Sequence, residues 1–169
     1  MYVSKYAPQI ELKQFDEDVP EIQTLNQELI AIDKAKKAWG KIKKPVLVDD
    51  LGIYFEQYDN FPGALAKFVY TGIGVKGILK LVEKNNKAYR KLMLVYFDGT
   101  HSKTFEAVCP GKIVPPRKSK SPSSFPWNAI FIPDGSNKTS AEIYGTSEEE
   151  KYNHRTQALK NFLKWFLQK

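Results

Sequence analysis

The stretch Pro45-Val46-Leu47-Val48-Asp49-Asp50 is a short aliphatic, β-branched run that starts at a proline and ends in two acidic side chains. A short apolar run bounded in this way is typical of a strand buried on both faces. It therefore predicts a buried strand whose end delivers the carboxylates of Asp49 and Asp50. Buried strands seldom end in two charges, so the pair is a candidate for chemistry.

The segments on either side of this run alternate between helical and strand patterns. The expected helices are Asn26–Trp39 with Gly40 as its stop, Ala64–Tyr70 and Val75–Glu83 broken around Gly72 and Gly74, and a long amphipathic Glu148–Lys169. The other expected strands are Ile10 with Leu12, Leu92–Phe97, Lys103–Val108 extended by Ile113-Val114, and Ala129–Ile132. Asp98-Gly99 predicts a hairpin between two of them. This order predicts an α/β fold, a mixed sheet with flanking helices.

Composition narrows the class of protein. The 169 residues are about one domain long, so residues 1–169 are expected to form a single domain. The 26 basic and 19 acidic side chains give a net charge of +7, which favours an anionic partner such as a phosphate. Cys109 is the only cysteine, which excludes an intramolecular disulfide and a structural zinc site. The sequence contains no long apolar run, so we expect a cytoplasmic protein without a membrane partner.

Four groups of side chains could carry chemistry, and each has a structural alternative. Glu21, Asp49 and Asp50 could hold Mg²⁺ beside phosphates, or they could cap turns at a solvated edge. The run Phe125-Pro126-Trp127-Asn128 could sandwich a nucleobase, although a packed core tryptophan is the favoured interpretation of that motif taken alone. His154-Arg155 could contact a base or a phosphate, or serve as a structural pair. A basic segment, Lys112, Arg117, Lys118 and Lys120, could face phosphates or nucleic acid, although such a run is usually only a solvated loop.

A series of motifs shares its order and spacing with one family. The series is Val19-Pro20-Glu21-Ile22-Gln23, Pro45–Asp50, Phe61-Pro62-Gly63, Gly111–Val114, Phe125–Asn128, Ile130-Phe131, Pro133-Asp134-Gly135, Ala141-Glu142 and His154-Arg155. It resembles the inosine triphosphate pyrophosphatase family, and it extends from about Ile10 to Leu167. The resemblance implies an elongated, two-lobed α/β fold with a cleft, often as a homodimer. It also implies Mg²⁺-dependent hydrolysis of ITP, dITP and XTP to monophosphate and diphosphate.

The resemblance also implies roles for individual residues. Glu21 and Asp50 would hold Mg²⁺, and Asp50 or Asp49 would orient or deprotonate the attacking water. The expected substrate-binding residues are Lys34 and Lys67 on the phosphates, Phe125, Trp127 and Asn128 around the base, and His154 and Arg155 on its edge. Arg and His donors can distinguish a 6-keto purine from adenine, which carries an amino donor at that position.

The sequence also departs from the family pattern. It contains no Ser/Thr-x-Asn-x-x-Lys motif, so the resemblance predicts that the amino-terminal phosphate-binding loop is absent. Pro126 and Asn128 stand where the family has Gly and Asp, and Glu149 stands where it has a lysine. Two alternatives to the enzyme therefore stay open. The first is a degraded relative that binds nucleotide without hydrolysing it; the second, less favoured, is a basic nucleic-acid-binding module.

Overall fold

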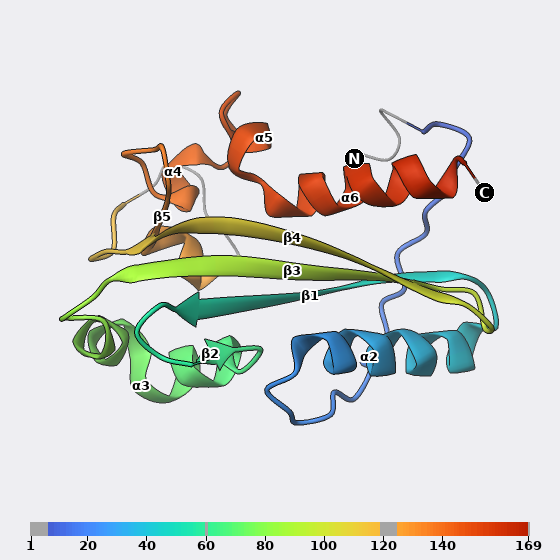
Figure 1. Ribbon diagram of the computed structural model, residues 1–169, viewed down its shortest axis with the longest axis horizontal. Helices are drawn as coiled ribbons and strands as arrows, with labels where there is room; N and C mark the ends of the chain where they lie inside the picture. The colour runs from blue at the N-terminus through green and yellow to red at the C-terminus, as the bar shows by residue number, and fades with distance from the viewer. Residues whose placement is uncertain (1–6, 60, 119–124, 169) are drawn as a thin grey trace. The chain divides into compact units, whose positions relative to one another are not determined.

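The computed structural model describes residues 7–59, 61–118 and 125–168 (Figure 1). In chain order the elements are α2 Gln27–Ile42, β1 Val46–Phe55, β2 Pro62–Gly63, α3 Ala66–Leu81, β3 Lys87–Phe97, β4 Ser102–Ile113, the 3₁₀ helix η1 Pro126–Ala129, β5 Phe131–Pro133, α4 Ser140–Ile143, α5 Glu149–Tyr152 and α6 His154–Phe166. No helix among these residues combines the length and the apolar character that crossing a bilayer requires.

The strands form one five-stranded sheet in the order β2-β1-β3-β4-β5. The outer pairs are antiparallel, with Ile53 of β1 opposite Gly63 and Lys112 of β4 opposite Ile132. The backbone N–H of Asp98 donates to the carbonyl of His101 at 3.2 Å and closes the predicted hairpin between β3 and β4. The predicted fold class, an α/β sheet with flanking helices, is confirmed.

The chain divides into two compact units, which we describe separately. The first comprises Met1–Asp50, Leu92–Ala107 and Arg155–Lys169, and the second comprises Leu51–Lys91 and Val108–His154. Strands β1, β3 and β4 each contribute residues to both units.

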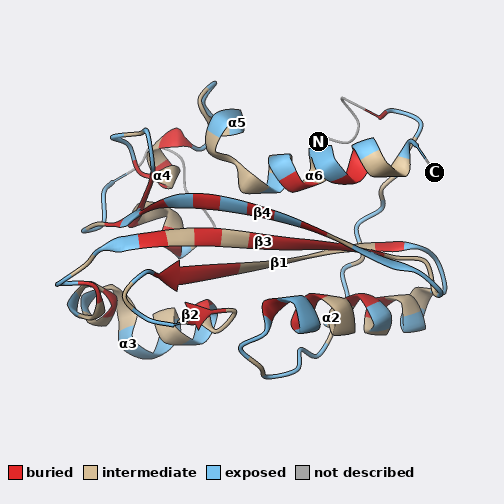
Figure 2. Ribbon diagram, viewed as in Figure 1, coloured by how far each residue is buried: buried red, intermediate tan, exposed pale blue. Residues whose placement is uncertain are grey.

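In the first unit, α2 and α6 cover opposite faces of the strands (Figure 1). The small residues Ala31 and Ala35 of α2 pack in one core cluster with Val95 of β3. On the other face, the ring of Phe162 in α6 lies 6.0 Å from that of Tyr96, between centroids. Successive strand residues point to opposite faces, so neighbouring residues of one strand serve the two helices. Figure 2 shows the buried residues of both helices turned toward the strands.

The second unit has a core of larger side chains. The end of β1 in this unit is buried (Figure 2). Its residues Ile53 and Phe55 cluster with Ile78 of α3 and with Trp127 and Phe131. Strand β5 lies very close to Gly111 of β4, because a Cβ there would approach the Ile132 carbonyl oxygen to 2.3 Å. Glycine is therefore required at position 111 for this close approach of the two backbones.

Two expected element ends in the first half of the chain are wrong. β1 does not stop at the acidic pair but continues to Phe55, so Asp49 and Asp50 lie within a strand rather than in a turn. α2 passes through Gly40 and ends at Ile42. The residue after it, Lys43, caps the helix: its backbone is left-handed, with φ 52°, and its N–H lies 2.7 Å from the Trp39 carbonyl. One glycine costs a helix only about 1 kcal/mol, which the packed alanine face offsets.

The other differences follow from short local patterns. Ile10 and Leu12 lie outside any strand, as do all described residues before α2, because two half-buried residues supply too little apolar surface. Ala129 ends the 3₁₀ helix, and the strand expected there is β5. The last helix is broken at Asn153, whose extended backbone separates α5 from α6. The Asn153 side-chain amide donates to the Glu149 carboxylate at 3.2 Å, and such local bonds compete with a continuous helix.

Candidate active site

The first unit gathers Glu21, Lys34 and Asp50 around the start of α2. Asn26 caps this helix by accepting a hydrogen bond from the backbone N–H of Leu29 at 3.2 Å. Gln27 and Lys34, seven residues apart, then share one face of the helix. The segment before the helix is held against it by Lys37, which donates to the Pro20 carbonyl at 2.9 Å. This contact adjoins Glu21, whose carboxylate forms an ion pair with the Lys34 ammonium.

Asp50 is a half-buried acid, and one of its carboxylate oxygens is fully covered. Burial raises the pKa of its carboxyl above the ordinary value of 3.8, a hydrogen bond from Gln27 and the charge of Lys34 oppose the rise, and Glu21 and Asp49 add to it. Gln27, only 2% exposed, also donates to the Asp50 backbone carbonyl at 3.0 Å. The Asp50 Oδ2 atom is buried and accepts no hydrogen bond. The group therefore has one buried carboxylate oxygen available to hold a proton or a cation.

The structure separates Asp49 from Asp50. Because the two are successive residues of β1, their side chains leave opposite faces of the strand. Asp49 points to the α6 side, where its Oδ2 accepts hydrogen bonds from Arg155 Nε at 2.7 Å and Nη2 at 2.5 Å. Asp50 lies on the α2 side with Glu21 and Lys34. The expectation that Asp50 or Asp49 acts on the attacking water stays a prediction, and the structure adds only that the two carboxylates lie on opposite faces of β1.

The remaining predicted site residues lie in the second unit. Lys67 is exposed in the first turn of α3. Trp127 is only 1% exposed, and its ring packs against Tyr70 and Phe55 with centroids 5.4 and 6.2 Å away. Phe125 is half-buried against the same core cluster. Trp127 is therefore a packed core residue in this conformation, which is the structural alternative named above. Of the two rings Phe125 and Trp127, that of Phe125 is the more accessible.

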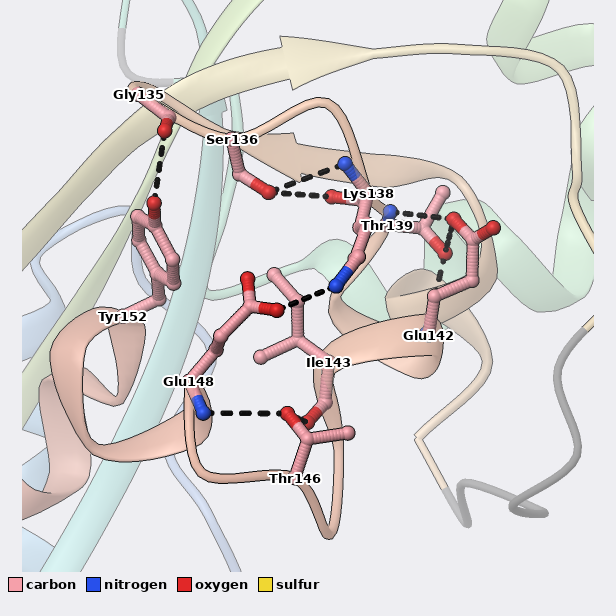
Figure 3. A network of polar contacts seen from close by, with 9 residues as sticks. All are labelled: Gly135, Ser136, Lys138, Thr139, Glu142, Ile143, Thr146, Glu148 and Tyr152. Atoms are coloured by element: carbon pink, nitrogen blue, oxygen red, sulfur yellow. Dashed lines mark hydrogen bonds and ion pairs between the residues drawn. The ribbon is translucent and has the colours of Figure 1, made fainter.

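His154 begins α6, and a polar network organises the chain before it (Figure 3). The Tyr152 hydroxyl donates to the Gly135 carbonyl at 2.8 Å, and Lys138 pairs with Glu148. Thr139 and Glu142 form a capping box at the start of α4. The backbone N–H of Thr139 is the main reason that the pKa of the Glu142 carboxyl is lowered. These contacts fix the path of the chain from β5 to the half-buried His154.

Glu149 and the basic segment have structural partners. The Glu149 carboxylate accepts from the backbone N–H of Gly145 at 2.9 Å, so this departure from the family pattern stabilises the turn before α5. Arg117 donates to the Asn137 carbonyl at 2.7 Å and lies 3.8 Å from the Glu142 carboxylate. Lys112 and Lys118 are exposed, and Lys120 lies outside the described residues.

Sequence reasoning missed two buried polar residues. Gln27 could have been found from its spacing with Lys34, since positions i and i+7 share a helix face. Arg90 could have been found by extending the strand pattern backwards from Leu92, since Ala88, Arg90 and Leu92 alternate inward. Arg90 is 4% exposed and donates through Nη1 to Asn128 Oδ1 at 2.8 Å. This bond gives the expected substrate-binding residue Asn128 a structural partner.

The residues present fit a partial Mg²⁺ site. Among the described residues, no three His, Cys, Asp or Glu side chains are gathered as a complete metal cage. Mg²⁺ does not need one, since it usually takes one or two carboxylates together with phosphates and water. The unpartnered Asp50 Oδ2 and the nearby Glu21 carboxylate supply that kind of oxygen ligand.

Comparisons with known proteins agree with the motif series. The sequence model of the Ham1 family matches residues 3–165. The dITP/XTP pyrophosphatase of Methanopyrus kandleri is 36% identical over 160 residues, which cover 93% of this chain and 84% of that protein. That of Thermococcus kodakarensis is 38% identical over 159 residues, 92% of this chain and 84% of that protein.

Solved structures share the fold. The Staphylococcus aureus Ham1 protein superposes with a TM-score of 0.73 at 22% identity, covering 98% of this chain and 84% of that one. A HAM1 protein from Coxiella burnetii gives a TM-score of 0.73 at 22% identity, with coverages of 89% and 82%. The family match over nearly the whole chain, together with these relatives, establishes that this chain belongs to the Ham1 family.

Proposed function

We propose that this chain hydrolyses the non-canonical purine nucleoside triphosphates ITP, dITP and XTP to monophosphate and diphosphate, with Mg²⁺. The broader class, a nucleoside triphosphate pyrophosphatase, follows from family membership and from relatives named dITP/XTP pyrophosphatases. The observation that carries the proposal is the half-buried Asp50 carboxyl, whose buried Oδ2 atom has no hydrogen-bond partner, beside Glu21 and Lys34.

Each residue of this group has a task in the proposed reaction. Asp50 and Glu21 would hold Mg²⁺, which when bound supplies positive charge to the phosphates. Asp50 would also orient the attacking water or accept its proton. Gln27 fixes the strand at Asp50. The Lys34 ammonium, now paired with Glu21, would neutralise phosphate charge, and Lys67 would do the same.

In this proposal, the hydrogen-bond donors of Arg155 and His154 and the aromatic ring of Phe125 recognise the base. Asp49 occupies Nε and Nη2 of Arg155 and so orients its guanidinium, which leaves Nη1 to donate. Together with His154, this donor would favour the 6-keto oxygen of hypoxanthine or xanthine over the amino group of adenine. Phe125 would stack on the base, with Trp127 supporting the turn from the core and Asn128 beside it.

The test is diphosphate release from ITP, dITP, XTP and ATP over a range of Mg²⁺ concentrations. We expect release from the first three, little from ATP, and loss of activity in Asp50→Asn. Glu106→Gln removes an exposed carboxylate from β4 and is the matched control, so it should keep wild-type activity. Absence of release from every nucleotide at every Mg²⁺ concentration would refute the proposal.

Nucleotide binding without hydrolysis is the second candidate. The observation that favours it is the Lys34 ion pair, which engages the Glu21 carboxylate that the metal would need. Calorimetric titration with ITP and inosine monophosphate distinguishes the two functions, because a binder shows heat of binding while releasing no diphosphate. Heat absent with both ligands would exclude this candidate.

The homodimer and the cytoplasmic location expected from sequence are also proposals. Light scattering at several protein concentrations tests the dimer, for which a mass near twice 19.4 kDa is the expected result. A mass of one chain at all concentrations would refute it. Cell fractionation with an antibody against the chain tests the location.

A further inference from the structure

Arg90 is a buried charge that the reaction proposed above does not use. It lies in β3 at 4% exposure, and none of the ion pairs found among the described residues involves it. Burial lowers the pKa of its guanidinium to about 10, while the nearby Cys109 opposes this shift. Burying a cation without a carboxylate partner is unfavourable, so other local contacts must compensate for the burial of Arg90.

Two hydrogen bonds and one ring contact of Arg90 provide this compensation. Nη1 donates to Asn128 Oδ1 at 2.8 Å, and Nη2 donates to the Ser140 hydroxyl. The guanidinium also lies over the ring of Phe131, 4.2 Å from its centroid. One side chain of β3 thus holds η1, β5 and the start of α4, all within the second unit.

The turn that Arg90 holds has little regular structure of its own. η1 is a single 3₁₀ turn without a side-chain cap, and such turns have poor hydrogen-bond geometry. Its backbone bonds run from the N–H of Asn128 to the Phe125 carbonyl at 3.0 Å and from Ile130 to Trp127 at 3.2 Å. The Arg90 bond ties this turn to a central strand of the sheet.

We infer that Arg90 is a positioning residue, which sets the place of the Phe125–Asn128 turn through Asn128 and Ser140 and thereby the affinity for the purine base. The inference rests on the proposed function, in which Phe125 stacks on that base. Only a planar fork can donate to two acceptors at once while stacking on a ring, so lysine cannot replace arginine here.

The test compares a ligand that has a base with one that lacks it. In Arg90→Lys, we expect the KM for ITP to rise about tenfold, because a change of this size corresponds to the loss of one charge-assisted hydrogen bond. We expect kcat to change less than about threefold. Inhibition by inorganic tripolyphosphate, which has no base, should keep its wild-type constant. Lys87→Gln removes an exposed charge from the same strand and should change neither value.

A second readout follows the turn directly. The indole N–H resonance of Trp127, assigned by its loss in Trp127→Phe, should move in Arg90→Lys and stay in Lys87→Gln. Ser140→Ala removes one of the two hydrogen-bond acceptors of Arg90 and keeps the arginine itself. It should therefore raise the KM for ITP and move the Trp127 resonance by smaller amounts, and it provides the test even if Arg90→Lys fails to fold.

The outcomes separate this inference from the proposed function. An unchanged KM with an unmoved Trp127 resonance would overturn the role of Arg90, as would an equal weakening of ITP and tripolyphosphate, which indicates a general loss of fold. A wild-type protein that releases no diphosphate would refute the proposed function alone. In that case, the Trp127 resonance and the calorimetric affinity for inosine monophosphate would decide the role of Arg90, which requires both to change in the variant.

Discussion

Replacing Asp50 by asparagine should stabilise the folded protein at neutral pH while abolishing hydrolysis. Burial raises the pKa of this carboxyl in the folded state above its ordinary value of 3.8. Near pH 3 and below, the carboxyl is protonated in both the folded and the unfolded state. As the pH rises, the unfolded chain loses the proton first, so the free energy of unfolding falls until the folded state has ionised too.

The size of the effect follows from the unpartnered oxygen. A buried polar atom without a hydrogen bond costs about 1–3 kcal/mol. Asparagine keeps a polar atom at the Oδ2 position but removes the charge, so we expect the lower end, about 1 kcal/mol. For a chain of this size that corresponds to a melting temperature higher by about 2–4 °C. Diphosphate release should fall about 10²–10⁴-fold, because the proton acceptor is lost.

The assay is thermal unfolding of wild type and Asp50→Asn from pH 3.5 to pH 8. The gap in melting temperature should be small at the acid end and largest near neutrality. Asp49→Asn is the matched control: it loses a half-exposed ion pair to Arg155 and should be less stable than wild type by about 0.2–1 kcal/mol. Mg²⁺ should raise the melting temperature of wild type but not of Asp50→Asn, because in the proposed function it binds the folded state through Asp50.

Two results would refute the reasoning. Asp50→Asn that melts no higher than wild type at pH 7 would show that the buried carboxylate is not unfavourable there. A gap of the same size at pH 3.5 and pH 7 would show that it does not arise from the titration of Asp50.

Three further substitutions test the other parts of the site. Lys34→Gln should raise the KM for ITP about tenfold or more through the lost phosphate contact, while melting within a few degrees of wild type because the Glu21 pair is partly exposed; an unchanged KM contradicts the phosphate role. Arg155→Lys should reduce the preference for ITP over ATP about tenfold, measured as the ratio of kcat/KM values, and an unchanged ratio would remove Arg155 from base recognition. Trp127→Ala should destabilise the protein by about 3–5 kcal/mol in denaturant unfolding, whereas Trp127→Phe should cost less; a loss below 1 kcal/mol in the alanine variant would contradict its place in the core.

Local sequence patterns predicted the structure best where a strand pattern stands next to side chains that could carry chemistry. The run Val46–Val48 predicted a strand beside two acids, and both are present. The same run did not show that Leu51 to Phe55 continue the strand, because an acidic pair resembles a terminus when read alone. The strand continues because its last residues, including Ile53 and Phe55, are buried in the second unit's core.

Some residues of the candidate site were also predictable from sequence, and others were not. The family resemblance implied roles for Glu21, Lys34 and Asp50, and the structure gathers these three side chains at α2. Arg90 carries no motif, since an arginine in a strand is ordinarily assigned to the surface. Its importance comes from Asn128 and Ser140, which are 38 and 50 residues away in sequence.

The amino-acid sequence by itself determined the family, the α/β class and which residue types are available for phosphate and base. These properties reside in local order and spacing, which a one-dimensional pattern records. Only the tertiary structure decided that Asp49 and Asp50 lie on opposite faces of one strand, that Trp127 is buried, and that Arg90 donates a hydrogen bond to Asn128 in the turn. Each of these depends on which distant side chains exclude water or supply a hydrogen-bond partner, and therefore on packing that no local pattern contains.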